Sequence, residues 1–122
     1  MNNRKIQNKN NPLANTLIVK YCDSFFCQLI GYMFTSVVNA EEGLLLVQTS
    51  DSRIFSSIHM FFVFTDLAVI WMDSNFRVVD KILAKSWKPF YFPCLPARYI
   101  LEINPSRLGE FTVGDQLELI NE

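Results

Sequence analysis

Two adjacent apolar runs, residues 57–64 and 67–72, constrain the fold of this chain more than any other feature. Apolar residues stand at consecutive as well as alternate positions in both runs, which is typical of strands buried on both faces. No segment keeps a helical apolar period over roughly ten positions, so we expect no long amphipathic helix. Thr65 and Asp66 separate the two runs, which therefore fall short of the ~20 apolar residues that span a bilayer.

Shorter strand-like runs flank this pair and are divided by turn residues. Residues 73–75 predict a turn, which makes residues 67–72 and 76–83 a β-hairpin. A proline followed by a glycine favours one short helix over residues 105–108. The sequence thus predicts an all-β fold, a single antiparallel β-barrel or jelly-roll-like sandwich with at most one short helix. The other predicted strands are residues 17–21, continuing through 25–26 after a bend, and residues 44–47, 97–103 and 116–120.

The chain has 122 residues, half of them apolar, and a formal net charge of −1. This length and apolar content are enough for one domain that folds without disulfides or metals. We place the domain at residues 13–122. Residues 1–12 are polar, with three cations and no acid, and are predicted to be a disordered basic tail. The nearly neutral charge argues against a nucleic-acid partner, because domains that bind nucleic acid are usually basic. The basic tail would add only weak, salt-sensitive attraction.

Three cysteines, Cys22, Cys27 and Cys94, are an odd number and cannot form a complete disulfide framework. Reduced, buried thiols are the simplest interpretation. The alternatives are one bridge, either Cys22–Cys27 or Cys27–Cys94, and a reactive thiol. The first residues show no apolar export signal. We therefore expect a soluble, cytoplasmic protein with no membrane partner, and the oligomeric state is left open.

Six short blocks of sequence follow one another in a recognisable order. The blocks are residues 31–34 (GYMF), 42–47 (EGLLLV), 58–63 (IHMFFV), 73 with 77–80 (D, RVVD), 96–102 (PARYILE) and 113–115 (VGD). Together they resemble the family called domain of unknown function 192, over roughly residues 15–120. The resemblance implies a compact, barrel-like or jelly-roll-like all-β domain, in agreement with the strand pattern, and no established activity.

Two positions depart from the usual pattern of that family. Thr35 follows Phe34 where members usually carry an arginine, and Ala68 follows Leu67 where they usually carry an aspartate. The resemblance therefore does not carry a function based on that charge pair over to this chain.

Three polar residues are candidates for a site on the predicted strands. His59 is the only histidine and lies inside the first apolar run, where its simplest role is that of a satisfied core or rim residue. It could also act as a general base or as one metal ligand. Arg98 and Glu102 share one face of the strand predicted at residues 97–103. They are either solvated polar residues or an anchor for a carboxylate or phosphate.

Residues 85–96, the aromatic loop, contain three prolines that bar regular strand pairing. The loop either covers an open end of the barrel or presents Trp87 and Tyr91 as a platform for a sugar, peptide or partner protein. We place a candidate ligand site at the rim of the barrel. Its predicted members are His59, Arg98, Glu102, Trp87 and Tyr91.

Several catalytic and cofactor patterns are missing from the sequence. The glycines fall between strands and form no phosphate-binding loop, no GxSxG elbow is present, and no histidine–cysteine spacing suits a metal. We therefore predict no catalytic residue, metal or cofactor. The predicted function is a non-enzymatic ligand-binding or accessory module whose partner is an unknown small ligand or protein. The alternatives are a small enzyme with His59 as general base and an interaction module that docks through the aromatic loop.

Overall fold

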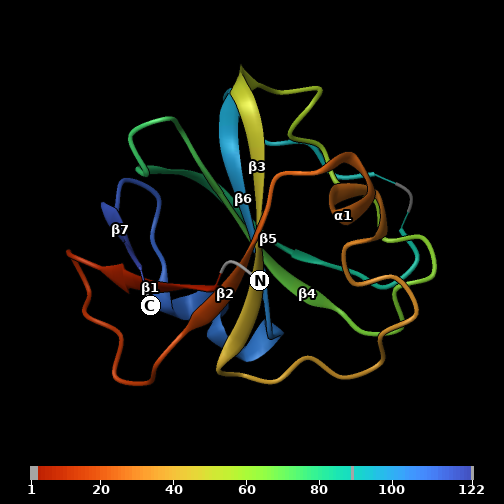
Figure 1. Cartoon of the computed structure of the whole chain (residues 1–122), viewed down its shortest axis with the longest axis horizontal. Coiled ribbons are helices and arrows are strands. Elements are labelled where there is room, and N and C mark those ends of the chain that lie inside the picture. The colour runs from red at the N-terminus through yellow and green to blue at the C-terminus, as the bar shows by residue number, and fades with distance from the viewer. Residues whose placement is uncertain (1–2, 89, 122) are drawn as a thin grey trace.

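One curled, seven-stranded sheet forms a half-barrel and carries the fold (Figure 1). The computed structural model describes residues 3–88 and 90–121. Across the sheet the strands follow the order β5-β4-β6-β3-β2-β1-β7. The strands are β1 (Asn3–Asn8), β2 (Ile18–Cys22), β3 (Glu42–Ser52), β4 (Leu67–Met72), β5 (Val78–Ala84), β6 (Ala97–Ile103) and β7 (Leu117–Asn121).

The predicted all-β fold is confirmed, with one amendment to its strand directions. The pairs β4–β5, β4–β6, β3–β6, β1–β2 and β1–β7 are antiparallel. Strands β2 and β3 are parallel neighbours. Parallel neighbours need a connection that crosses from one end of the sheet to the other. Residues 23–41 make this crossover, and they carry the helix α1 (Phe25–Ile30).

Helix α1 stands where the sequence predicts that the first strand continues through residues 25–26, and that prediction is wrong. The Ser24 hydroxyl accepts a hydrogen bond from the backbone N–H of Cys27 at 3.2 Å, so it caps the first turn. Gly31 ends the helix in a left-handed conformation, with φ of 47°.

The short helix predicted at residues 105–108 is confirmed as the 3₁₀-helix η1 (Pro105–Glu110), so residues 3–88 and 90–121 contain two short helices where the sequence predicts at most one. In the described part of the chain, no helix is long and apolar enough to cross a bilayer.

Strand β4 is buried along its whole length, as the sequence predicts. Successive side chains of a strand point to opposite faces of its sheet, and those of β4 enter two separate cores. The barrel core lies on the face that also receives side chains from β1, β2 and β7. The outer core lies on the opposite face and holds Leu67, Val69 and Trp71 of β4.

Residues 57–64 cover the outer core but do not form the buried strand that their composition predicts. Ile58 makes only a single antiparallel bridge, with Tyr91 of the aromatic loop. Met60 and Val63 are buried in the outer core. Burial alternates from Ile58 to Met60, but a turn at residues 61–62 breaks the alternation before Val63, so the segment packs on β4 as an irregular layer. Its exposed rings are Phe61, Phe62 and Phe64, at 38%, 43% and 48% exposure.

Strand β1 replaces the disordered tail predicted at residues 1–12, a prediction that is wrong for residues 3–8. The strand pairs with β2 on one side and with β7 on the other. Ile6 is 1% exposed in the barrel core, and the Asn8 side chain donates to Asp115 at 2.8 Å. Backbone pairing and one buried isoleucine thus order a segment whose composition is polar. Residues 1–2 lie outside the described residues.

A buried arginine joins η1 to two distant loops. Arg107 is 3% exposed, and its guanidinium donates to the carbonyl oxygens of Asn15, Thr16 and Ala40 at 2.7–3.0 Å. It also pairs with Glu110 at 2.8 Å. The five donors of the group suit a junction of several carbonyls, so Arg107 has a structural role.

The position of β1 can be tested with Ile6→Ala. Removing a fully buried isoleucine side chain should lower the free energy of unfolding by about 2–4 kcal/mol, because it leaves a cavity in the barrel core. Urea unfolding measures this. Lys9→Ala, in a half-exposed pair with Glu118 at 3.9 Å, is the control and should change stability by less than about 1 kcal/mol. Equal, small effects of both substitutions would contradict the pairing of β1.

Candidate functional site

Glu102 is a buried carboxyl on the outer face of the sheet. It lies on β6 between its register partners Leu44 of β3 and Val69 of β4, and it is 5% exposed. Within the described residues, no hydrogen bond or ion pair to its carboxyl group is found. Burial disfavours the charged form of the group and raises the pKa of Glu102 to about 7.

Two glycines allow other backbone segments to come close to β6 around this carboxyl. A Cβ atom on Gly31 would lie 3.4 Å from Oε1 of Glu102, so the end of α1 lies directly against the acid. A Cβ atom on Gly43 would lie 2.7 Å from the Ile103 side chain and 3.0 Å from the Glu102 carbonyl oxygen. Glycine at position 43 is therefore required for β3 to pair closely with β6.

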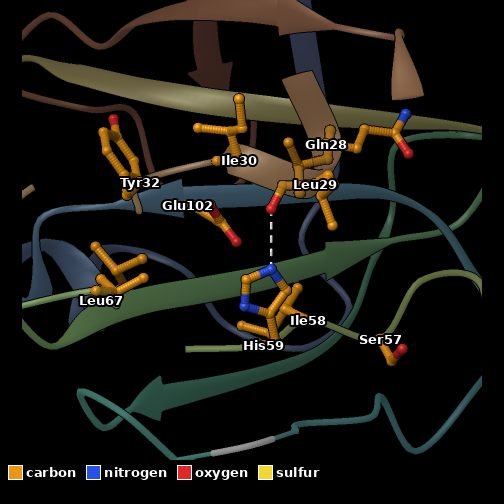
Figure 2. Close-up of a pocket in the computed structure, with 12 residues that line it drawn as sticks. Gln28, Leu29, Ile30, Tyr32, Ser57, Ile58, His59, Leu67 and Glu102 are labelled. Carbon is orange, nitrogen blue, oxygen red and sulfur yellow. Dashed lines mark hydrogen bonds between the residues drawn. The ribbon is translucent and has the colours of Figure 1, made fainter. Parts of the chain in front are cut away.

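The Glu102 carboxyl borders a small cavity of about 40 Å³ (Figure 2). The end of α1 and the following residues form one wall, and residues 57–63 form the facing wall. Strands β3, β4 and β6 close the remaining side. Figure 2 shows the carboxyl of Glu102 and the ring of His59 directed into the same space. The cavity has room for roughly three water molecules or one small polar head group.

His59 faces Glu102 across this cavity with one ring nitrogen engaged and the other without a partner. Nε2 lies 2.9 Å from the carbonyl oxygen of Leu29. A carbonyl can only accept, so Nε2 carries the proton and Nδ1 of the neutral ring is an acceptor. Nδ1 is buried and has no hydrogen-bond partner among the described residues.

An apolar groove of about 470 Å³ adjoins the cavity, since Leu29, Ile30 and His59 line both. The other lining residues are Met33, Phe61, Phe62 and Phe90. The rings of Phe61 and Phe90 meet edge to face, with centroids 5.9 Å apart. The groove thus offers aromatic and aliphatic contact next to a small polar pocket.

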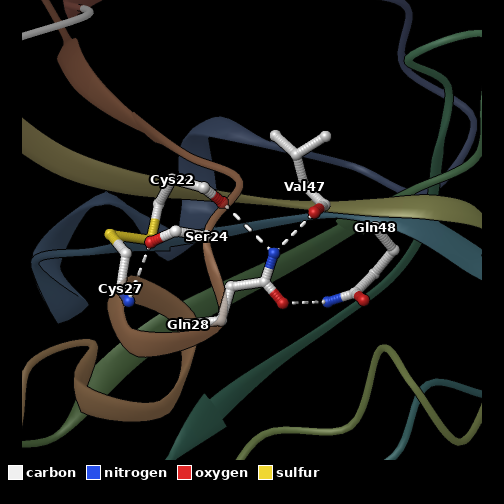
Figure 3. Close-up of a disulfide and its surroundings, with 6 residues drawn as sticks. All are labelled: Cys22, Ser24, Cys27, Gln28, Val47 and Gln48. Atoms are coloured by element: carbon white, nitrogen blue, oxygen red, sulfur yellow. Dashed lines mark hydrogen bonds between the residues drawn. A yellow bond between two sulfur atoms is a disulfide. The ribbon is translucent and has the colours of Figure 1, made fainter.

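Helix α1, which forms a wall of the cavity, is tied to the sheet by a disulfide and by one amide side chain (Figure 3). Cys22 and Cys27 form a disulfide, where the sequence favours reduced thiols, and Cys94 is free and exposed. The turn at Ser24 brings the two cysteines together, with Cα atoms 5.7 Å apart. The Gln28 amide donates to the Val47 carbonyl at 2.6 Å and accepts from Gln48 at 3.0 Å.

The other predicted site residues lie outside the cavity. Trp87 belongs to an aromatic cluster at the groove, with its ring 4.8 Å from Phe62. Tyr91 is 6% exposed, and its hydroxyl accepts from the backbone N–H of Lys85 at 2.7 Å. Arg98 donates through Nε to the Gln48 carbonyl at 3.0 Å, near the other end of β6. Of the five predicted residues, the structure brings only His59 and Glu102 to one cavity.

Sequence reasoning missed the residues that close the cavity from the α1 side. Tyr32 lies there, and burial together with the carboxylates of Glu102 and Glu42 raises the pKa of its hydroxyl. Gly31 and Tyr32 belong to the sequence block at residues 31–34. That block contributed to the family resemblance but did not indicate a functional site. Among the described residues, no group of three or more histidine, cysteine or acidic residues could hold a metal ion.

Comparison with known proteins decides the family. The profile of domain of unknown function 192, described as Uncharacterized ACR, COG1430, matches residues 5–119. The chain belongs to this family. The family match therefore runs from within β1 to within β7 and includes both Glu102 and His59.

Relatives of this DUF192 chain share its sequence over most of its length. UPF0127 protein TK1120 of Thermococcus kodakarensis is 43% identical over 84 residues, which are 69% of this chain and 52% of that protein. UPF0127 protein PF1050 of Pyrococcus furiosus is 36% identical over 103 residues, 82% of this chain and 84% of that protein. The chain spans about half the length of two of the curated relatives that it matches. These relatives are uncharacterised, and no activity comes from them.

Two crystal structures share the fold of this DUF192 chain. A protein of unknown function from Novosphingobium aromaticivorans has a TM-score of 0.79 at 20% identity, covering 95% of this chain and 83% of that chain. A candidate transcription regulator from Sinorhizobium meliloti has a TM-score of 0.81 at 18% identity, covering 97% of this chain and 92% of that chain. At these identities the likeness shows the fold alone.

The burial of Glu102 predicts how stability depends on pH. Its pKa is about 7 in the folded chain and near the ordinary 4.5 when unfolded, so the folded state binds more protons between these values. The free energy of unfolding should therefore fall as pH rises from about 4.5 to about 7, by about 3 kcal/mol from this group.

Urea unfolding of the wild type and Glu102→Gln across this pH range isolates the effect. The variant should gain stability relative to the wild type as pH rises, by about that amount above pH 8. Glu41→Gln, at an exposed position, is the matched control and should follow the wild type. A constant difference between the wild type and Glu102→Gln would show that Glu102 titrates normally.

Proposed function

We propose that this chain is a ligand-binding module that holds one small, largely apolar molecule in the joined cavity and groove. The observation that supports this most is the Glu102 carboxyl, buried beside an apolar groove with no partner among the described residues. A buried polar group without a partner lowers stability, and such a group in a cleft is typical of a functional site. A bound molecule would supply the missing partner.

The lining of the pocket suits a small molecule. Ligand sites in proteins are mainly apolar and carry a few polar groups that fix the orientation of the ligand. Here the groove supplies the apolar surface, and Glu102 and His59 supply the polar groups. Among the residues that the structure describes, no lysine or arginine lines the cavity or the groove, which supports a small-molecule partner rather than a nucleic acid.

Binding fits the geometry better than hydrolysis through a serine. Ser57 also lines the cavity, but its hydroxyl donates to the carbonyl oxygen of Ile54 at 2.7 Å. His59 is therefore not hydrogen-bonded to a hydroxyl that it could activate, which an acyl-transfer site requires.

The cytoplasmic location expected from the sequence stays part of this proposal. The Cys22–Cys27 disulfide counts against it, because disulfides persist mostly in oxidising compartments.

Thermal unfolding against a panel of small molecules tests the proposal. Each molecule has roughly six to twelve non-hydrogen atoms, with one polar head group and an apolar body matched to the pocket. At least one head-group class should raise the midpoint, by on the order of 10 °C at a hundredfold excess over its Kd.

Two lysine substitutions show whether binding uses the pocket. Ile30→Lys places a charge where the cavity and groove meet and should abolish the shift. Val37→Lys is the control, since Val37 is 79% exposed and lines neither. Midpoints that no class of molecule moves, or that move equally in Ile30→Lys, would overturn the proposal.

A further inference from the structure

We propose that the ligand of this pocket is a primary amine with an apolar tail, whose ammonium group lies in the cavity between Glu102 and His59. The inference rests on the proposed function, because it names the chemical class that the same pocket takes.

The polar atoms at the cavity are suited to a donor. The Glu102 carboxylate accepts hydrogen bonds, and Nδ1 of His59 is an acceptor because Nε2 holds the proton toward Leu29. An ammonium group carries three N–H donors and no acceptor. It can therefore engage the carboxylate and Nδ1 at the same time, whereas a carboxylate head group offers neither atom a donor.

Charge favours the same head group. In the described part of the chain no lysine or arginine lines the cavity, so an ionised Glu102 has no cation to compensate it there. An isolated charge in a buried site is costly, and an opposite charge within hydrogen-bond distance offsets that cost. An anionic ligand would meet a charge of its own sign, and a neutral alcohol would leave the carboxylate uncompensated.

Size and polarity separate the head of the ligand from its tail. The cavity of about 40 Å³ admits an ammonium group but not a bulky quaternary one. The groove of about 470 Å³ is lined mostly by aliphatic and aromatic side chains, among them Ile30, Met33 and Phe61. Burying an apolar tail there removes its surface from water, and this provides affinity that a head group alone would lack.

Three titratable groups bear on this carboxyl. His59 faces it from residues 57–63, and Tyr32 faces it from the segment after α1. Glu42, on the same face of β3 as Leu44, adds negative charge near Tyr32. The six residues of α1 and of β4 contribute no charged side chain. Ionisation of Glu102 favours an ammonium ligand, so its binding becomes tighter as pH rises through about 7.

Isothermal titration calorimetry with 2-phenylethylamine tests the inference, alongside 2-phenylethanol and 3-phenylpropanoate as matched probes. The amine should bind at least about tenfold more tightly at about pH 8 than at about pH 6, since Glu102 ionises between them. At about pH 6, amine binding should release about one proton, read from heats in buffers of different ionisation enthalpy. The alcohol should bind no more tightly at the higher pH, and the propanoate should bind weakly.

Variants of the folded protein separate the roles of the two polar residues. Glu102→Gln should abolish the proton release and weaken the amine at least about tenfold, while leaving the alcohol unchanged. His59→Gln should weaken the amine but keep the tenfold pH effect that Glu102 produces. Glu41→Gln is the control and should match the wild type. Should Glu102→Gln fail to fold, proton release by the wild type and the His59→Gln result still decide the matter.

The outcomes distinguish this inference from the proposed function. Binding of the alcohol or the propanoate that Ile30→Lys abolishes, with no binding of the amine, overturns the amine and keeps the ligand-binding module. Amine binding that is independent of pH and of Glu102 also overturns the inference. Failure of all three probes, together with a panel that shifts no midpoint, overturns both.

Discussion

The burial of β4 and β6 on both faces is the constraint on which the rest of this structure depends. A half-barrel needs only one buried face, yet β4 is buried at every position and β6 nearly so. The second face must therefore be covered by other parts of the chain, and it is covered by α1, residues 57–64 and the aromatic loop. Trp71 shows how closely this layer fits, since its indole N–H donates to the Ser56 carbonyl at 2.8 Å. An irregular cover packs less evenly than a second sheet, and the cavity and groove lie within it.

A carboxyl on a strand that is buried on both faces loses its hydration, whereas a carboxyl on an exposed strand keeps it. Glu102 lies at a buried position of β6, between Leu44 and Val69, where an apolar residue such as leucine or valine would be expected. Its burial lowers the stability of the fold at neutral pH, and no internal cation offsets this within the described residues. A structural arginine is handled in the opposite way, because Arg107 is buried with three carbonyl oxygens and Glu110 around it. Arg107 thus has four partners, whereas the carboxyl of Glu102 has none among the described residues, and this contrast supports a role for Glu102 outside the fold.

The sequence predicted most strands because their burial pattern and turn residues are local features. The hairpin of β4 and β5, strand β6 and the short helix at Pro105 needed no knowledge of distant contacts. The strand predicted at residues 57–64 was wrong because apolar composition indicates burial but not backbone geometry. An irregular covering layer is as apolar as a strand. Helix α1 is too short for a helical period, and β1 is ordered by partners at residues 18–20 and 117–121 that no local pattern reveals. The sequence singled out His59 as a lone histidine in an apolar run and Glu102 as a polar residue on the same strand face as Arg98. That His59 and Glu102 share one cavity follows only from the crossover between β2 and β3.

A hydrogen bond joins the imidazole of His59 to the α1 wall of the cavity. A six-residue helix is not stable by itself, so α1 depends on its attachments to the sheet. The disulfide and Gln28 hold its first turns against β2 and β3, and His59 holds its last turn through the Leu29 carbonyl. That same hydrogen bond fixes the proton on Nε2 and leaves Nδ1 as a buried acceptor without a partner among the described residues. The contact that helps to hold α1 over Glu102 therefore also decides which nitrogen of His59 can accept a hydrogen bond in the proposed site.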